Sequence, residues 1–414
     1  MNEVSPDWQR NPIKPGAPII PRNEWDLPPY NRWTFQHVSE MTATAPIWRG
    51  PGPVLPLPER ITEIDGIEYE MAGRRSTIRE FLDSSFTDGF LVLSRGEVIA
   101  ERYMNGLKPH RQHLAMSMTK SIMGSVCGIL IHKGLIDTDS PVTRYLPELE
   151  TTAYHGAIVQ QVLDMTTGVA ITGPYTKPGT HAYMLQAAAG WRPAESPDDP
   201  QTTWQLILRL TEQQRPHGTL FEYRSIESNV LGFIMERASG MPLAELISTE
   251  LWAPMRAEED AYITVDHGGF ACADGGFNAT LRDYARFALL HLRGGELNGK
   301  QIVPSEWIEE TRRGNHDIFG ESKILPKGAY HNQFWIEDSQ RRALMCGGNG
   351  GQRIYIDPQN DFAAVKLSSW PDGETDRYVE ALAAIRAIRD ACTARWMAGR
   401  EHNAVGADIA PRHS

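Results

Sequence analysis

The order of strand-like and helix-like segments is the feature that most constrains the fold of this chain. Apolar runs around a Gly turn predict a hairpin with strands at 90–94 and 98–103. Strand-like runs return only late, at QRIYIDP and DFAAVKLSSW, whereas the segment between them, from about 151 to 260, has mainly helical spacing. A sheet built from both ends of the chain and interrupted by a helical insertion accounts for this order.

These segments divide the 414 residues into a sheet domain, a helical domain and two ends. Residues 75–150 and 260–400 are predicted to form an α/β sheet domain, and residues 151–259 a helical domain. Residues 1–74 are predicted to be an arm packed on the main domain, because their Pro content excludes long helices and their Trp and Tyr content argues against a free tail. Residues 401–414 are the predicted C-terminal tail.

Two helices with a marked apolar side are predicted within the sheet domain. The first runs from about 117 to 133, with Gly134 just past its end. The second runs from about 378 to 396. Their apolar positions recur at helical spacing, at Ile122, Met123, Val126, Ile129 and Leu130 in the first and at Val379, Leu382, Ile385 and Ile388 in the second.

Composition excludes several classes of partner. The formal net charge is -11, and no Lys/Arg run could serve as a phosphate-binding stripe, so nucleic acid is not an expected partner. No apolar run of about 18 residues predicts a membrane span, and no signal peptide is visible, so the expected location is the cytoplasm. The four cysteines lie far apart, which predicts reduced, mostly buried thiols rather than a zinc site or a disulfide framework.

A Ser-x-x-Lys motif stands at the start of the first predicted helix. Residues three apart share one helix face, so the Ser117 hydroxyl and the Lys120 amine can meet. Lysine acts as a base only when neutral, and its free pKa is about 10.4, so burial or nearby positive charge must lower that pKa. The alternative is a helix-start serine followed by a solvated lysine. The apolar stretch after Lys120 favours a buried amine, because an unpaired buried ammonium is costly.

A tyrosine about a hundred residues later is a second acid/base candidate. Tyr223, in PHGTLFEYRS, stands in a turn before a predicted helix. A phenol near a lysine can ionise or relay a proton. The alternative is a core tyrosine with a satisfied hydroxyl, the commoner case for a lone tyrosine.

Six ordered sequence blocks resemble the serine β-lactamase-like superfamily, which includes class C β-lactamases, DD-peptidases and family VIII carboxylesterases. They are HLAMSMTKSIMGSVCGILIHKGLIDTDSPVTRYLPEL, VLDMTTGV, PHGTLFEYRS, GGFNATLRDYARF, GGNGGQRIYIDP and VKLSSWPD. PPYNRWTFQHVSEM and VKLSSWPD are most similar to the nylon-oligomer hydrolase branch, the 6-aminohexanoate-dimer hydrolases. The resemblance implies an α+β fold in which an antiparallel sheet flanked by helices stands beside a mainly helical domain, with the active site between them.

The resemblance also implies roles for individual residues. Ser117 resembles the nucleophile, Lys120 the general base, and Tyr223 the tyrosine that shuttles protons to the leaving group. The backbone N–H groups of Ser117 and of the strand edge near Asn349 would form the oxyanion hole. Tyr175, in TGPYTKPG, resembles a loop tyrosine that closes over substrate, although a solvent-exposed loop tyrosine is an equal alternative.

The late blocks depart from the penicillin-recognising pattern. Ser225 stands where β-lactamases and DD-peptidases have the Asn of Tyr-x-Asn, and the stretch from Asn349 to Gln352 replaces Lys-Thr-Gly. The missing lysine would hold a substrate carboxylate, and its loss argues against penicillin as the natural substrate. Gln352 and Arg353 should point to opposite faces of a strand, and we expect Gln352 to face the pocket.

Two further positions bear on a substrate amine. The 6-aminohexanoate branch places an acidic residue where this chain has Gln186, and a polar residue where this chain has Asp274. Asp274 could therefore supply a nearby acid. The predicted substrate-binding residues are Tyr175, Gln186, Ser225, Asp274, Asn349 and Gln352.

The sequence thus predicts a serine hydrolase that forms an acyl-Ser117 intermediate without a metal or organic cofactor. The expected substrates are small molecules, with short carboxylic esters first and small amides second. One alternative is a dedicated 6-aminohexanoate-oligomer hydrolase, and another is a binding or sensing module with little turnover. A homodimer is compatible with the sequence, which leaves the oligomeric state open.

Overall fold

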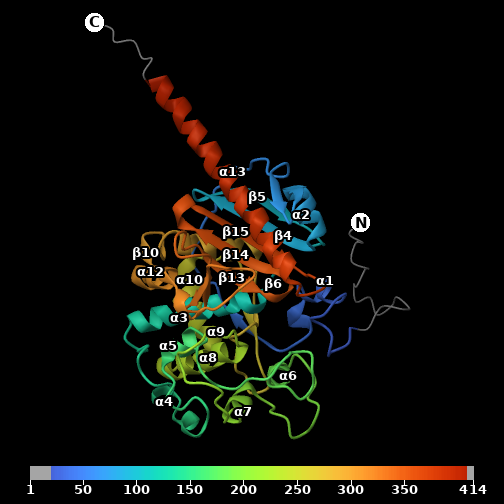
Figure 1. Cartoon of the computed structure of the whole chain (residues 1–414), viewed down its shortest axis with the longest axis vertical. Coiled ribbons are helices and arrows are strands. Elements are labelled where there is room, and N and C mark those ends of the chain that lie inside the picture. Colours follow the sequence, from blue (N-terminus) through green and yellow to red (C-terminus); the bar gives the residue numbers. More distant parts are fainter. Residues whose placement is uncertain (1–19, 408–414) are drawn as a thin grey trace.

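A seven-stranded antiparallel sheet forms the centre of the computed structural model, which describes residues 20–407 (Figure 1). The strand order is β11-β12-β13-β14-β15-β4-β5, so the last strand pairs directly with the early hairpin. The strands are β4 (Thr87–Ser94), β5 (Glu97–Tyr103), β11 (Ala329–His331), β12 (Phe334–Ile336), β13 (Leu344–Gly348), β14 (Gln352–Asp357) and β15 (Phe362–Ser368). The predicted hairpin and the α+β class are confirmed.

Helices cover both faces of this sheet, because apolar side chains alternate along its strands. Tyr355 packs on the side of α13 (Thr375–Ala407), whereas the adjacent Ile354 belongs to the opposite cluster, which includes α11 (Leu281–Leu292). Three other helices of the sheet region are α2 (Ile78–Ser84), α3 (Thr119–His132) and α12 (Ser305–Arg313). Each fully buried aliphatic side chain in these layers contributes about 1.5–3 kcal/mol.

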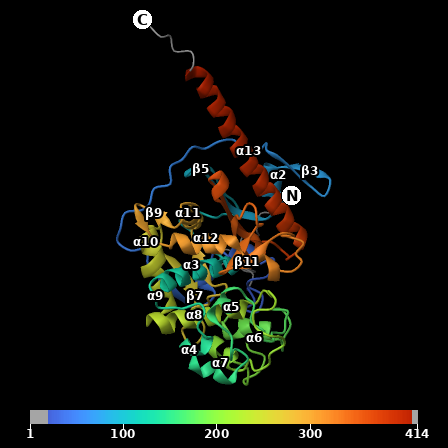
Figure 2. The same cartoon turned by 60° about the vertical axis from the view of Figure 1, so that its left-hand side comes forward.

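The segment between 151 and 259 is helical and lies at the end of the molecule away from α13 (Figure 2). Its helices are α5 (Val159–Leu163), α6 (His181–Ala188), α7 (Thr203–Leu208), α8 (Ser225–Ser239), α9 (Leu243–Ile247) and α10 (Ala253–Met255). The predicted helix in WQLILRLTEQ ends early, at Leu208. The domain limits themselves stay a prediction.

A second, four-stranded sheet ties the N-terminal arm to the segment before Ser117. Its strand order is β1-β7-β8-β6. The strands are β1 (Thr44–Ile47), β6 (His113–Leu114), β7 (Ala261–Thr264) and β8 (Phe277–Ala279). Because β1 comes from the arm and β6 directly precedes the Ser-x-x-Lys motif, the arm helps to fix the position of that motif.

Short elements complete the described chain. Besides the 3₁₀ and π turns, they are α1 (Asn31–Thr34), β2 (Glu68–Met71), β3 (Arg74–Thr77), α4 (Val142–Tyr145), β9 (Glu296–Leu297) and β10 (Lys300–Gln301). The longest helix, α13, continues to Ala407, past the predicted end at Trp396, because helix-forming Ala, Arg and Glu residues follow and the next Pro is Pro411.

Other predictions concern the thiols and the chain ends. All four cysteines are free, and Cys127, Cys272 and Cys346 are buried, as predicted. In the part of the chain that the structure describes, no helix has the length and apolar character to cross a membrane. The segment examined for a signal peptide and residues 408–414 of the predicted tail lie outside the described residues.

Candidate active site

Ser117 lies in a tight turn between a strand and a helix. A 3₁₀ turn covers Met116–Met118, and α3 begins at Thr119, two residues after the predicted helix start. Met116 has a φ of +48°, a left-handed conformation that costs a non-glycine residue about 1–2 kcal/mol. The Thr119 hydroxyl donates to the Met116 carbonyl at 2.7 Å and accepts from the Phe277 N–H at 3.1 Å. These bonds fix the turn that carries Ser117.

The Lys120 amine is buried and contacts three oxygen atoms. Its Nζ lies 2.9 Å from Ser117 Oγ, 3.2 Å from Ser225 Oγ and 2.6 Å from the Asp274 carbonyl oxygen. Burial lowers the pKa of Lys120, and the Asp274 charge opposes that shift. A neutral amine has two N–H donors and one lone pair. Donation to Asp274 and Ser225 would leave the lone pair for the Ser117 proton.

Tyr223 stands beside this pair, two residues before α8 begins at Ser225. Its ring stacks on Trp335 with centroids 5.1 Å apart and meets Tyr330 edge-on at 5.8 Å. Burial raises the pKa of Tyr223, while a hydrogen bond with Ser117 opposes that rise. The phenol is therefore protonated near neutral pH. It can donate a proton but cannot act as a preformed phenolate base.

The end of β13 closes against the Ser117 turn. A Cβ on Gly348 would lie 2.5 Å from the Ala115 carbonyl oxygen, so only glycine allows this approach. Asn349 follows at the strand end and lines the same pocket as Ser117. Its predicted part in an oxyanion hole stays a prediction.

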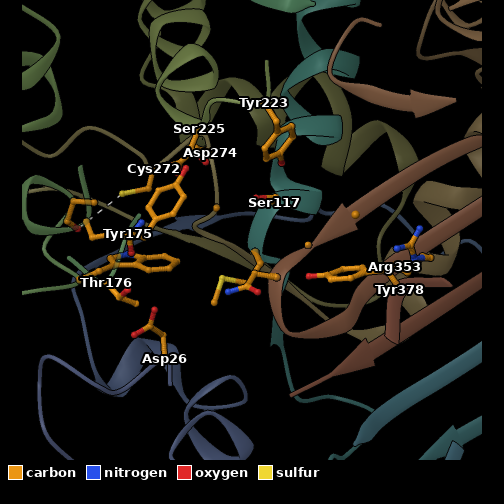
Figure 3. A pocket seen from close by; sticks show the side chains of 18 of the residues that line it. Asp26, Ser117, Tyr175, Thr176, Tyr223, Ser225, Cys272, Asp274, Arg353 and Tyr378 are labelled. Atoms are coloured by element: carbon orange, nitrogen blue, oxygen red, sulfur yellow. Dashed lines mark hydrogen bonds between the residues drawn. The ribbon is translucent and has the colours of Figure 1, made fainter. Parts of the chain in front are cut away.

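A cavity of about 480 Å³ brings most of the predicted residues together (Figure 3). Ser117, Tyr223 and five of the predicted substrate-binding residues line it, namely Tyr175, Gln186, Ser225, Asp274 and Asn349. The Lys120 side chain lies behind Ser117 and is 1% exposed. The cavity is large enough for a small organic molecule.

Two of the lining residues are held close to Lys120. The Tyr175 hydroxyl hydrogen-bonds with Ser225 and lies near Lys120, although the residue as a whole is 39% exposed. Asp274 accepts from Asn229 Nδ2 at 3.1 Å through one carboxylate oxygen. Tyr175 thus connects its loop to the buried Lys120 and Ser225 side chains.

The expectation that Gln352 faces the pocket is wrong. Gln352 is fully buried, and its amide bonds the Ser368 backbone on the neighbouring strand, whereas Arg353 lines the cavity. The two side chains do alternate, but Gln352 shares its face with Ile354, which packs into the core. The cavity opens instead toward the α13 side, where Tyr378 also lines it.

Sequence reasoning missed several cavity residues that come from distant segments. Asp26 belongs to the arm and pairs with Arg192 at 2.8 Å, while Trp25 and Trp191 meet edge-on at 5.1 Å. Other missed lining residues are Leu27, Cys272, Trp335 and Tyr378. The arm's aromatic content was the only local signal. No cluster of three or more metal-ligating side chains occurs among the described residues.

Comparison with known proteins places this chain in a family. The sequence pattern of the Beta-lactamase family matches residues 75–388. This chain belongs to the Beta-lactamase family. It is therefore a hydrolase of the serine hydrolase superfamily, as predicted, and its family fold is the predicted one.

Two relatives match this chain over most of its length. The 6-aminohexanoate-dimer hydrolase of Paenarthrobacter ureafaciens is 37% identical over 365 residues, 87% of this chain and 90% of that protein. A Bacillus anthracis structure provisionally described as a 6-aminohexanoate-dimer hydrolase has a TM-score of 0.81 and 28% identity, over 90% of this chain and 96% of that one. A family VIII carboxylesterase, at 18% identity and TM-score 0.55 over 75% and 96% of the two chains, shares the fold.

Proposed function

We propose that this protein hydrolyses small carboxylic esters and amides through an acyl-Ser117 intermediate. The observation that carries the proposal is the 2.9 Å contact between Lys120 Nζ and Ser117 Oγ at the wall of the cavity. A buried amine with a lowered pKa can accept the serine proton as the hydroxyl attacks a carbonyl carbon.

The remaining groups suit the later steps of such a reaction. Lys120 takes the Ser117 proton, and the Tyr223 hydroxyl, bonded to Ser117, donates a proton to the leaving oxygen or nitrogen. The backbone N–H groups of Ser117 and Asn349 are the proposed donors to the carbonyl oxygen. Tyr223 regains a proton from the Lys120 ammonium, which restores both groups. Water then attacks the acyl carbon and gives a proton to Lys120, this proton passes to Ser117 Oγ as its bond to the acyl carbon breaks, and the acid product leaves.

Amides of amino acids are a second candidate substrate class. The 37% identity to a 6-aminohexanoate-dimer hydrolase favours it, and so does the Asp274 carboxylate in the cavity, which can pair with a substrate amine. Gln186 also lines the cavity and provides no charge. We therefore keep short esters and small amides together as the proposed substrates.

A fluorophosphonate probe tests the nucleophile, and a substrate panel tests the class. We expect the probe to label the wild type and not Ser117→Ala, with both proteins equally folded by circular dichroism. Labelling of Ser117→Ala at the wild-type rate would contradict the proposal. Kinetics on 4-nitrophenyl butyrate, 6-aminohexanoate dimer and nitrocefin would then rank esters, linear amides and β-lactams, with nitrocefin expected last.

A further inference from the structure

Five arginine side chains are buried in the described part of the chain, and four of them contact a carboxylate. The four pairs are Arg192 with Asp26 (2.8 Å), Arg224 with Glu222 (2.6 Å), Arg286 with Asp283 (2.9 Å) and Arg389 with Asp390 (2.8 Å). The fifth, Arg353, is 6% exposed and makes no ion pair with any side chain from residue 20 to residue 397. A buried cation without an anion is costly, so its surroundings need an explanation.

The contacts that Arg353 does make are weak ones. Its Nη1 lies 3.9 Å from the Met345 sulfur, and its guanidinium carbon lies 5.8 Å from the centre of the Tyr378 ring. The nearby charged groups are cations. Lys366 is its register partner on β15, and the Arg386 charge adds to burial in lowering the pKa of Arg353. Among the side chains that the structure describes, no carboxylate pairs with Arg353.

Part of the Arg353 residue forms the wall of the cavity. Arg353 lines the cavity together with Tyr378, at the α13 side of Ser117 (Figure 3). Its register partner on β13 is Gly347, which also lines the cavity and has no side chain to fill the space between strand and pocket. An anion in the cavity can thus reach Arg353.

We propose that Arg353 binds a carboxylate of the substrate, so that this hydrolase prefers esters or amides that carry a free carboxylate. The proposal rests on the proposed function of Ser117 and names the substrate class for it. A planar guanidinium pairs with a carboxylate through two N–H donors, and the Tyr378 hydroxyl lies at the same end of the cavity.

The positions of the cavity carboxylates indicate how a linear substrate would lie. Asp26 and Asp274 lie on the side of Tyr175, away from Arg353 (Figure 3). Asp26 is already paired with Arg192, and Asp274 is bonded to Asn229. A linear substrate would place its carboxylate toward α13, where the unpaired cation is.

Two pairs of esters test whether Arg353 binds a carboxylate on the acyl group or on the leaving group of the substrate. Mono-4-nitrophenyl glutarate against 4-nitrophenyl butyrate probes a carboxylate on the acyl side, and 4-(butyryloxy)benzoate against phenyl butyrate probes one on the leaving side. We expect Arg353→Met to lower kcat/KM for the carboxylate ester of one pair by about 10- to 100-fold, the range of hydrogen bonds to charged groups, and to change its neutral partner by less than about threefold. Arg353→Lys should recover part of the loss.

Lys366→Met is the matched control, because Lys366 is a buried neighbouring cation that does not line the cavity. It should leave the preference for the carboxylate ester unchanged. Equal changes for the charged and neutral esters in Arg353→Met, in both pairs, would overturn the proposal.

A binding measurement separates this proposal from the proposed function. Calorimetric titration of Ser117→Ala with glutarate should show binding that weakens at least tenfold when Arg353→Met is added. Unchanged glutarate binding, or none to either protein, would overturn the role of Arg353. If the wild type is neither labelled by fluorophosphonate nor active on any ester, the function of Ser117 is wrong, and the titration still decides the role of Arg353.

Discussion

Two lysines are buried in the part of the chain that the structure describes, and only one of them adjoins the cavity. Lys120 Nζ contacts the Ser117 and Ser225 hydroxyls beside the pocket, whereas Lys366 Nζ lies 3.2 Å from the Ser85 carbonyl and contacts the Ser368 hydroxyl inside the sheet. Burial lowers the pKa of both, for Lys366 to about 7.

A buried lysine next to a serine is not enough for catalysis. Lys366 has a hydroxyl partner and a lowered pKa, but its ammonium lies 5.4 Å and 5.5 Å from the Phe81 and Trp370 ring centres, and it does not line the cavity. Lys120 differs because its serine partner faces a space that a substrate can enter. Access to the cavity, and not pKa alone, distinguishes the candidate base.

The largest expected effect on activity comes from substituting Lys120. Lys120→Arg keeps the charge but cannot lose a proton near neutral pH, so kcat/KM on the best ester should fall about 10³- to 10⁴-fold. Lys366→Met should stay within about threefold of the wild type. Steady-state kinetics on both variants checks this, with thermal unfolding to confirm that each is folded. Near-normal turnover by Lys120→Arg would move the base role elsewhere.

Lys366 should instead affect the pH dependence of the free energy of unfolding. Below about pH 7 both the folded and unfolded states carry a charged Lys366, and the folded state bears the full cost of burying it. Between about pH 7 and pH 10.5 the unfolded state binds the extra proton, so the free energy of unfolding contributed by this residue rises with pH, by about 5 kcal/mol in all.

Lys366→Met removes that titration. Urea unfolding at pH 6, 8 and 10 should show the variant at its greatest advantage over the wild type at pH 6, with the advantage shrinking toward pH 10. A difference between variant and wild type that is constant with pH would contradict the lowered pKa of Lys366.

Tyr223→Phe should give the next effect, because it removes one hydroxyl and keeps the stack on Trp335. The loss of the proton donor should lower kcat by about 10²- to 10³-fold with little change in KM. Presteady-state kinetics should show slower acylation by substrates with poor leaving groups. An equal loss for good and poor leaving groups would argue that Tyr223 does not protonate the leaving group.

Local sequence predicted the parts of the site that one segment supplies, and missed the parts that distant segments build. Ser117 and Lys120 share one turn, so their contact follows from spacing. Strand alternation correctly separated Gln352 from Arg353, but the face that opens to the cavity depends on α13 and on Gly347. No single segment contains that information.

The fold shows the same division. The early hairpin and the late strands could be predicted because their apolar runs are continuous. The pairing of β1 with β7, more than two hundred residues apart, could not be predicted, since a four-residue strand with mixed burial in a Pro-rich arm has no distinctive pattern. That pairing brings Asp26 and the arm near the cavity.

The smallest expected effect concerns Tyr175, the residue that connects the loop to the Lys120 cluster. Its hydroxyl hydrogen-bonds with Ser225, which also contacts Lys120, so Tyr175→Phe removes a bond one step away from the base. A neutral hydrogen bond is worth about 1 kcal/mol, or about fivefold in kcat/KM. Because the ring itself remains at the cavity, KM should change little in Tyr175→Phe, whereas Tyr175→Ala, which removes the ring, should raise KM. Steady-state kinetics on one ester and one amide checks this. A fall in kcat comparable to that of Tyr223→Phe would mean that Tyr175 takes part in proton transfer. Lys120 would then differ from Lys366 through its contact with Tyr175 as well as through its access to the cavity.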